Sequence, residues 1–180
     1  TPKSNGPIFE AASAYKFEKD IFVSNGDTWN TQGLQWMQNA LPDYNFHVCD
    51  NPKITGHIDT HFAILRPGLV WSGHPKNDLP EYFKTWEVIE VDTSTDKTLR
   101  TGQTLVDHKV QDDDFEGTTL SVNVLSLDEN TVFLYDHYKD NANILQLLDK
   151  HKIEPIWVEF TFSHFFNQGL TCLTTEINRD

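Results

Sequence analysis

The chain has 180 residues, of which 38% are hydrophobic and 12% aromatic, so it can bury a core and we expect one domain spanning residues 1–180. It carries 27 acidic against 14 basic residues, for a formal net charge of -13. This charge argues against a nucleic-acid partner and against binding to an anionic membrane.

The lengths of the apolar runs and the number of cysteines indicate the cellular compartment of the chain. No apolar run reaches the roughly 20 residues that span a bilayer, and the residues from Thr1 to Gly6 have no signal-peptide core. Cys49 and Cys172 are too few for a disulfide framework. We therefore expect a soluble, cytoplasmic protein with free thiols and no membrane partner.

A first unit of hairpin, helix and strand is predicted near the amino terminus. Pro7–Glu10 and Ile21–Val23 read as the hairpin. A helix is predicted to begin at Asp27 and to end before Pro42, and Phe46–Cys49 reads as the strand that follows.

The same order of elements appears in a second unit. His57–Leu65 reads as a strand, Arg66-Pro67-Gly68 as a turn and Leu69–Ser72 as the returning strand. A helix capped by Asn77 is predicted next, because apolar side chains recur at i, i+3, i+4 and i+7. The helical apolar residues are Leu79, Tyr82, Phe83 and Trp86, and the closing strand is Val88–Val91.

A polar stretch separates the second unit from a third. Residues 93–118 contain Asp112-Asp113-Asp114 and are predicted to be a loop or lid insertion. The third unit has a hairpin, a helix and a strand in the same order, and a further strand closes the chain. These elements are Leu120–Leu127, Val132–Tyr135, a helix carrying Ile144, Leu147 and Leu148, Ile156–Phe160, and Leu170–Asn178. We expect an α/β fold of about three units plus a strand, packed as a sheet or around an axis.

The predicted strand that opens the second unit carries three polar residues at alternate positions. Strand geometry would place His57, Asp59 and His61 on one face. That face is either exposed or satisfied by mutual hydrogen bonds, or it contributes to a site. With His74 nearby a zinc site is an alternative, but no second ligand cluster is evident and we predict no metal.

Two further residues gain interest from their position in the repeats. Cys172 follows Gly169 on the last predicted strand, and by itself it could be either an inert buried thiol or a nucleophile. Glu10 lies on the first strand of the first unit. A ring of units would bring Glu10, His57 and Cys172 to one axis, and a thiol, an imidazole and a carboxylate are what nucleophilic catalysis requires.

At these motifs the sequence resembles the arginine:glycine-type amidinotransferases of the pentein superfamily. Gly56-His57-Ile58-Asp59-Thr60-His61-Phe62 resembles the His-x-Asp motif of that family. The similarity continues through Leu120–Leu125 and closes at Cys172, so that it covers nearly the whole chain and corresponds to the family's carboxy-terminal half.

The resemblance implies a pentein-type α/β propeller, here incomplete, and it implies roles for several residues. Cys172 would be the nucleophile, His57 the general acid and base, and Glu10 the carboxylate beside it, where this family usually has aspartate. Asp59 would bind the guanidinium. Lys76 lies near the family's arginine for the substrate carboxylate, and Asn123 is a further substrate-binding candidate.

The implied reaction moves an amidino group from arginine to an amine acceptor such as glycine through an amidino-cysteine intermediate, without a cofactor. An arginine or guanidine hydrolase on the same scaffold and a non-catalytic truncated module are the alternatives. The family has a glycine-rich loop with a histidine directly before the cysteine, where this chain reads Phe166–Thr171. Family members are also about twice as long, so we expect either that a second copy or a separate polypeptide completes the ring, or that a naturally shortened form buries its open edges by oligomerising.

Overall fold

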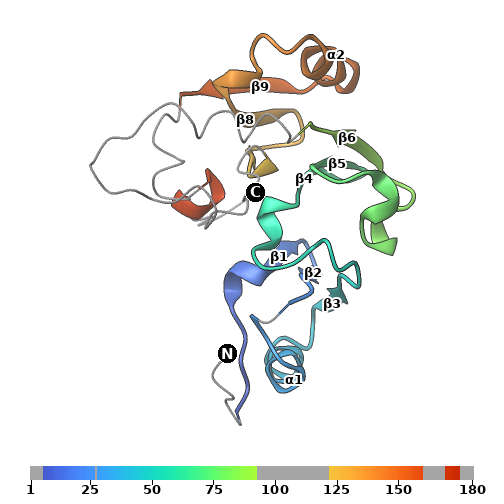
Figure 1. Cartoon of the computed structure of the whole chain (residues 1–180), viewed down its shortest axis with the longest axis vertical. Helices are drawn as coiled ribbons and strands as arrows, with labels where there is room; N and C mark the ends of the chain where they lie inside the picture. Colours follow the sequence, from blue (N-terminus) through green and yellow to red (C-terminus); the bar gives the residue numbers. More distant parts are fainter. Residues whose placement is uncertain (1–5, 27, 93–121, 160–168, 175–180) are drawn as a thin grey trace, which may run out of the picture.

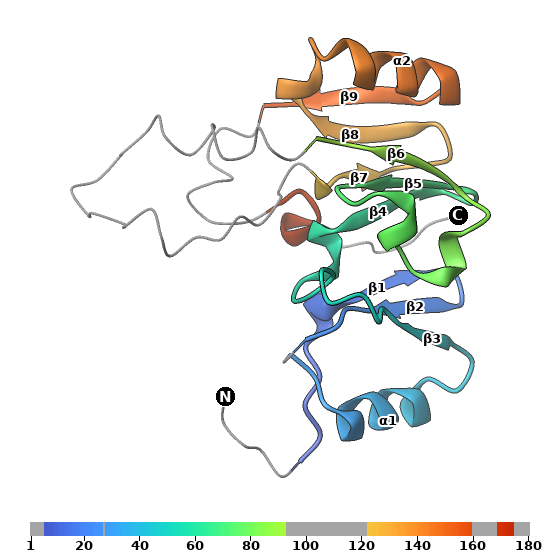
Figure 2. The ribbon, with the colours of Figure 1, turned by 45° about the vertical axis from the view of Figure 1, so that its right-hand side comes forward.

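The structure is a computed structural model that describes residues 6–26, 28–92, 122–159 and 169–174. It contains three separate three-stranded sheets, each built from consecutive segments of the chain. Figure 2 shows the sheets following one another along the long axis of the molecule, with helix α1 near one end and helix α2 at the other. The predicted insertion at residues 93–118 lies outside the described residues.

The first sheet has an antiparallel hairpin and a parallel third strand. Strands β1 (Ala14–Phe17) and β2 (Asp20–Val23) form the hairpin. Helix α1 (Thr31–Ala40) then returns the chain, so that β3 (Asn45–Val48) pairs in parallel with β2. The predicted helix, the last strand and the second hairpin strand at Ile21–Val23 are thus present, but the first hairpin strand is Ala14–Phe17 and not the predicted Pro7–Glu10.

The other two sheets repeat this topology, with the second strand in the middle each time. Their parallel third strands require a crossover, which the segment between the second and third strands supplies. The strands of the second sheet are β4 (Phe62–Arg66), β5 (Leu69–Ser72) and β6 (Glu87–Glu90). The third sheet has β7 (Leu125–Ser126), β8 (Thr131–Tyr135) and β9 (Glu154–Val158), with helix α2 (Ala142–His151) before β9.

The predicted helix of the second unit was wrong. Two short 3-10 turns, η3 (Lys76–Asp78) and η4 (Glu81–Phe83), occupy this crossover. Leu79 between them is extended because it precedes Pro80, which disfavours the helical conformation in the residue before it. The apolar spacing did not predict the helix correctly, but it did mark residues that are buried: Phe83 is fully buried and Leu79 nearly so.

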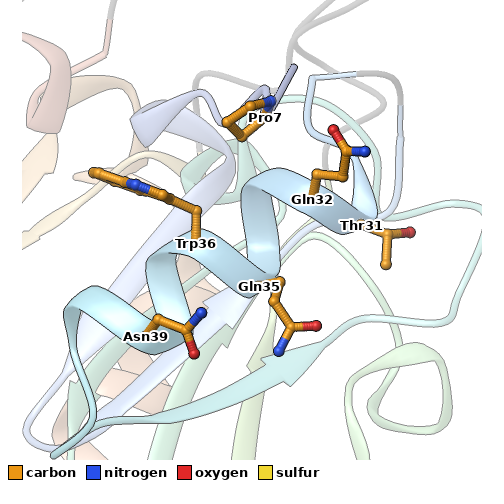
Figure 3. A pocket seen from close by; sticks show the side chains of 6 residues that line it. All are labelled: Pro7, Thr31, Gln32, Gln35, Trp36 and Asn39. Carbon is orange, nitrogen blue, oxygen red and sulfur yellow. The ribbon is translucent and has the colours of Figure 1, made fainter. Parts of the chain in front are cut away.

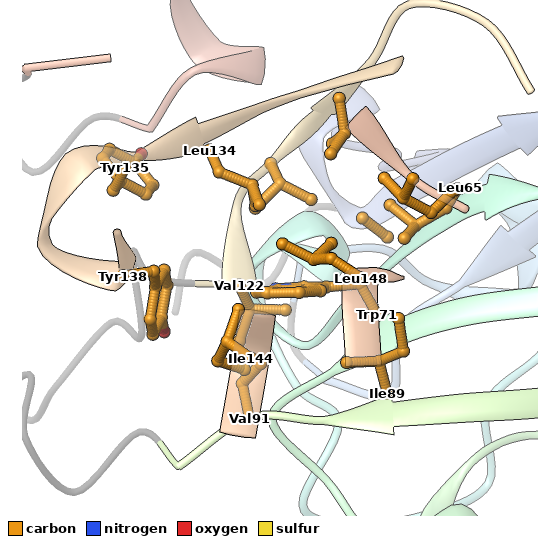
Figure 4. Close-up of a cluster of buried hydrophobic side chains, with 14 of the residues drawn as sticks. Leu65, Trp71, Ile89, Val91, Val122, Leu134, Tyr135, Tyr138, Ile144 and Leu148 are labelled. Atoms are coloured by element: carbon orange, nitrogen blue, oxygen red, sulfur yellow. The ribbon is translucent and has the colours of Figure 1, made fainter. Parts of the chain in front are cut away.

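Two hydrophobic clusters join neighbouring sheets. One is built around Phe22, Phe62 and Phe83 and links the first sheet to the second. The other links the second sheet to the third, and Figure 4 shows Trp71, Ile144 and Leu148 within it. The sheets therefore stabilise one another, as expected of repeats that cannot bury both faces alone.

Polar contacts reinforce the junction between the second and third sheets. The Ser126 hydroxyl donates to the carbonyl of Leu65 at 2.7 Å. The Arg66 guanidinium donates to the carbonyls of Glu129 at 2.9 Å and His151 at 2.8 Å.

Among the residues that the structure describes, no helix has the length and apolar character for a membrane crossing.

The two helices are attached to the molecule in different ways. Helix α2 buries Ile144, Leu148 and His151 against the core, whereas Gly33 is the buried residue of α1. A shallow, open hollow lies on the outward side of α1 beside Trp36, whose exposed fraction is 59% (Figure 3). The helices thus occupy corresponding places in their units without equal packing.

Candidate active site at the turns before the first strands

The sequence-predicted site residues gather at the segments that precede the first strand of each unit. Glu10 lies before the 3-10 turn η1 (Ala11–Ser13), which leads into β1. The turn η2 (Ile58–Thr60) follows His57 and leads into β4, and Asn123 precedes β7. Cys172 lies in a similar turn, η8 (Thr171–Leu173).

The prediction of a strand from His57 to Leu65 was wrong at its beginning. Gly56 has φ +69°, a backbone conformation that favours glycine, and Ser24 donates a hydrogen bond to its carbonyl at 2.5 Å. The Thr60 hydroxyl donates to the carbonyl of His57 at 2.7 Å. Such a local bond competes with strand pairing and favours a turn.

Because residues 58–60 form a turn, the three polar residues do not share one face. His57 Nε2 lies 3.4 Å from Glu10 Oε1, and both side chains are about half exposed. Asp59 faces Asn123 and Thr171. His61 lies within hydrogen-bonding distance of the Thr55 carbonyl and of His74. One pattern in the sequence therefore serves three different contacts.

Asp59, Asn123 and Thr171 form a closed set of hydrogen bonds. Asn123 Nδ2 donates to Asp59 Oδ2 at 2.7 Å, and the backbone N–H of Thr171 donates to Asn123 Oδ1 at 2.8 Å. The Thr171 hydroxyl lies 2.5 Å from Asp59 Oδ2. This set joins η2, the segment before β7 and η8, so it brings the turn of Cys172 against the turn of Asp59.

Gly169 is needed where the last segment approaches Asn123. A Cβ atom at residue 169 would lie 2.2 Å from Asn123 Cγ, a distance that no packing adjustment of a few tenths of an ångström relieves. The N–H of Leu170 also donates to the Tyr135 hydroxyl at 3.2 Å. The glycine at residue 169 thus allows the backbone of the segment Gly169–Cys172 to pack directly against the buried side-chain amide of Asn123.

The two cysteines lie in contrasting surroundings. Cys49 is buried at the end of β3, and burial, with a smaller contribution from Asp50, raises the pKa of its thiol to about 12. Cys172 is exposed. A thiol with such a raised pKa has almost no thiolate at neutral pH, so Cys172 is the candidate nucleophile of the pair.

The remaining predicted residues are less closely connected. Lys76 lies in η3, where its backbone N–H donates to Glu90 Oε1 at 3.1 Å. Within the described part of the chain, no hydrogen bond or ion pair joins Lys76 to the other candidates, or Cys172 to His57. The predicted strand at residues 170–178 was wrong over Thr171–Leu173, which form η8, and residues 175–180 lie outside the described part.

His61 and His74 form a pair that sequence reasoning considered only as metal ligands. Their Nδ1 and Nε2 atoms are 2.8 Å apart and their rings stack. Burial lowers the pKa of both imidazoles, which favours the neutral form, and a neutral ring has the unprotonated nitrogen that accepts such a hydrogen bond. Over the described residues, no group of three or more His, Cys, Asp or Glu side chains is arranged to hold a metal ion.

Thr171 is the functional candidate that sequence reasoning missed. It drew notice only as a departure from the histidine that the resemblance led us to expect before the cysteine. A short hydroxyl next to a candidate nucleophile is a weak signal, and its partner Asp59 lies 112 residues away in the chain.

Comparisons with known proteins agree with this arrangement at the level of family and fold. No protein-family model matches the chain. It is 31% identical over 181 residues to the mitochondrial glycine amidinotransferase of Gallus gallus, across 96% of this chain and 39% of the relative. It is 26% identical over 177 residues to inosamine-phosphate amidinotransferase 1 of Streptomyces griseus, across 96% of this chain and 47% of the relative.

Solved structures show the same fold. An amidinotransferase of the saxitoxin biosynthetic pathway from Microseira wollei superposes with a TM-score of 0.76 at 24% identity, over 97% of this chain and 46% of that one. A dimethylarginine dimethylaminohydrolase superposes with a TM-score of 0.64 at 13% identity, over 94% and 58%. The described residues show small mixed sheets and no closed barrel. The chain is therefore a homologue of the inosamine-phosphate and glycine amidinotransferases of the pentein superfamily, with the α/β pentein fold, and spans less than half the length of those relatives.

Proposed function

We propose that the chain supplies the cysteine half of an amidinotransferase site, which moves an amidino group from arginine to an acceptor amine such as glycine. The observation that carries the proposal is the hydrogen-bonded set of Asp59, Asn123 and Thr171, because it brings the turn that carries the exposed Cys172 against a carboxylate. A carboxylate is the preferred partner of a planar guanidinium.

Each residue then has a role in a two-step transfer. The Cys172 thiolate attacks the guanidinium carbon of arginine, and the bond from that carbon to the ornithine nitrogen breaks while the protonated His57 gives its proton to the leaving amine. The acceptor amine attacks the amidino-cysteine, His57 takes the proton of that amine, and the carbon–sulfur bond breaks. Glu10, at 3.4 Å from His57, stabilises the imidazolium.

Two residues support the substrate rather than the proton transfers. In this proposal Asp59 binds the guanidinium, and Asn123 acts mainly by holding Asp59, since its fully buried amide is bonded at both ends. Lys76, which is partly exposed, would bind the substrate carboxylate as a point charge.

The proposal is tested by exposing the purified chain to arginine and measuring its intact mass. We expect an amidino adduct on Cys172 that is absent from Cys172→Ala and retained in Cys49→Ala, the matched control at the buried thiol. Added glycine should remove the adduct and yield ornithine with an amidinated amine. Absence of both adduct and product, with or without glycine, in the protein assembled with whatever completes its ring, would contradict the proposal.

A hydrolase is the second candidate, and the exposure of Cys172 favours it. Because Cys172 is exposed and the His57 side chain is half exposed, water can reach an intermediate at this position. If water is the acceptor, arginine gives citrulline and ammonia with no dependence on glycine. The same incubation therefore separates the two reactions by their products.

We further propose that a second copy or another polypeptide completes the ring of sheets that this chain begins. The described residues contribute three sheets, and the chain matches 47% and 39% of the two relatives named above. Sedimentation of the active protein tests this directly. A fully active monomer would count against any need for a partner.

A further inference from the structure

The Thr171 hydroxyl holds one oxygen of the Asp59 carboxylate. It lies 2.5 Å from Asp59 Oδ2 and 2.8 Å from Asn123 Oδ1, and it has a single proton to donate. Asn123 Oδ1 already accepts the backbone N–H of Thr171. The shorter contact is with the group that can carry a charge, so the proton belongs in the bond to Asp59.

The two oxygens of Asp59 are consequently not equivalent. Oδ2 accepts from both Asn123 and Thr171. Oδ1 is buried and has no hydrogen-bond partner among the described residues. An unpaired buried carboxylate oxygen is costly unless a donor reaches it, and the N–H group of a bound cation would supply that donor at Oδ1.

We infer that Thr171 is a positioning residue: its hydroxyl locks the Asp59 carboxylate so that Oδ1 alone is presented to an amidinium or guanidinium N–H beside Cys172. This inference rests on the proposed function, since it assumes that a planar cation binds at Asp59. It adds that Thr171, the residue directly before Cys172, fixes the direction of the contact between Asp59 and the bound cation. Figure 2 shows η8 beside η2, the turn that carries Asp59.

A merely structural role for Thr171 makes a different prediction, and the turn itself offers the control. Thr174 lies in the same segment and its hydroxyl donates to the Leu170 carbonyl at 3.0 Å, and in the described part of the chain no hydrogen bond joins it to Asp59. If the hydroxyl of Thr171 only stabilises η8, Thr171→Val and Thr174→Val should behave alike.

Alkylation of Cys172 by two reagents of the same shape tests the inference without requiring turnover. Chloroacetamidine is cationic and chloroacetamide is neutral, and in each case the thiolate forms a sulfur–carbon bond while chloride leaves. The measured quantity is the ratio of the two rates, divided by the same ratio for free cysteine. Peptide mapping confirms that labelling is at Cys172.

We expect the wild-type ratio to exceed that of free cysteine and to fall to the free-cysteine value in Asp59→Asn. Thr171→Val should lower the ratio about tenfold, the effect of losing one hydrogen bond to a charged group. Thr171→Ser keeps the hydroxyl and should restore the ratio, and Thr174→Val should leave it unchanged. The chloroacetamide rate monitors whether the turn of Cys172 is intact, and Thr171→Ala provides a second variant if Thr171→Val does not fold.

Two outcomes overturn the inference, and they are distinguishable. If Thr171→Val and Thr171→Ala keep the wild-type ratio while Asp59→Asn loses it, Thr171 does not position the carboxylate and the proposed function stands. If wild-type protein shows no preference for the cation over free cysteine, the binding of a planar cation at Asp59 is itself wrong, and this inference fails with it.

Discussion

Helices α1 and α2 occupy the same place in two repeated units, yet they are held by different forces. Helix α2 inserts Ile144 and Leu148 into the core cluster between the second and third sheets. Neither hydrophobic cluster contains a buried residue of α1. The difference shows that the topology of a unit does not determine how its helix is stabilised.

Hydrogen bonds and a close backbone contact hold α1 instead. Asn30 caps the helix by accepting from the N–H of Gly33 at 2.8 Å, and it also bonds to the backbone of Gly6 and Ile8. Gly33 lies against the Ile8 carbonyl, which a Cβ atom would approach to 1.8 Å. Helix α1 is therefore fixed through the segment before η1, near Glu10.

The largest expected difference between the helices comes from truncating an apolar side chain in each. Leu148→Ala should reduce the free energy of unfolding by about 2–5 kcal/mol, because it leaves a cavity in the core. Met37→Ala on the partly exposed α1 should cost less than about 1 kcal/mol. Urea unfolding measures both, and equal losses would show that α1 packs as tightly as α2.

A methyl group added to α1 should give the next largest effect, and in an unusual direction. Alanine is the better helix former by about 1 kcal/mol, yet Gly33→Ala should destabilise by about 1–3 kcal/mol, because its Cβ displaces the backbone of Ile8. Gln35→Ala, on the exposed side of the same helix, is the control and should be near neutral. A Gly33→Ala protein more stable than wild type would refute the close contact.

The two cap residues offer a matched pair, since asparagine caps both helices. Asn141→Ala loses the bonds to the N–H groups of Asn143 and Ile144, and should cost about 1 kcal/mol. Asn30→Ala loses the cap and the tie to Gly6 and Ile8, so we expect about 2 kcal/mol. Thermal unfolding of both variants decides the order, and a larger loss at Asn141 would reverse our account.

The smallest expected effect is the share of the pH dependence that comes from His151 at the end of α2. Burial lowers the pKa of His151, against the opposing effect of Glu87 at 3.1 Å, so the folded chain binds this proton less readily than the unfolded chain. Its contribution is complete above the ordinary value of 6.5 and is lost as the pH falls through that value toward the lowered pKa. His151→Gln should flatten the fall in the urea midpoint between about pH 7.5 and pH 5.5. Parallel curves for both proteins would exclude His151 as a source.

Local sequence signals predicted the units well where turn chemistry and periodicity agreed. Arg66-Pro67-Gly68 predicted the turn between β4 and β5, and the spacing of Ile144, Leu147 and Leu148 predicted α2. The local signals failed where a segment that forms a turn has the alternating pattern typical of a strand. The alternation from His57 to His61 imitates a strand, but the left-handed Gly56 and the Thr60 hydroxyl favour a turn.

The sequence allowed candidate residues for the site to be chosen, but it did not predict which of them contact one another. A thiol, an imidazole and a carboxylate are recognisable in a sequence, and His57 does lie beside Glu10. The bond between Thr171 and Asp59 depends on how three turns from different units meet, which no local pattern encodes. The same applies to Gly169, whose role follows from the Asn123 side chain that it covers.

The bonds among Asp59, Asn123 and Thr171 also bear on the order of folding. They connect residues that are 48, 64 and 112 positions apart, so each must overcome the entropy of closing a long loop. The hairpins and helices close far shorter loops and are expected to form first. We therefore expect Cys172 to reach its mature surroundings last during refolding, which pulsed thiol labelling along the refolding time course would register as the slowest change.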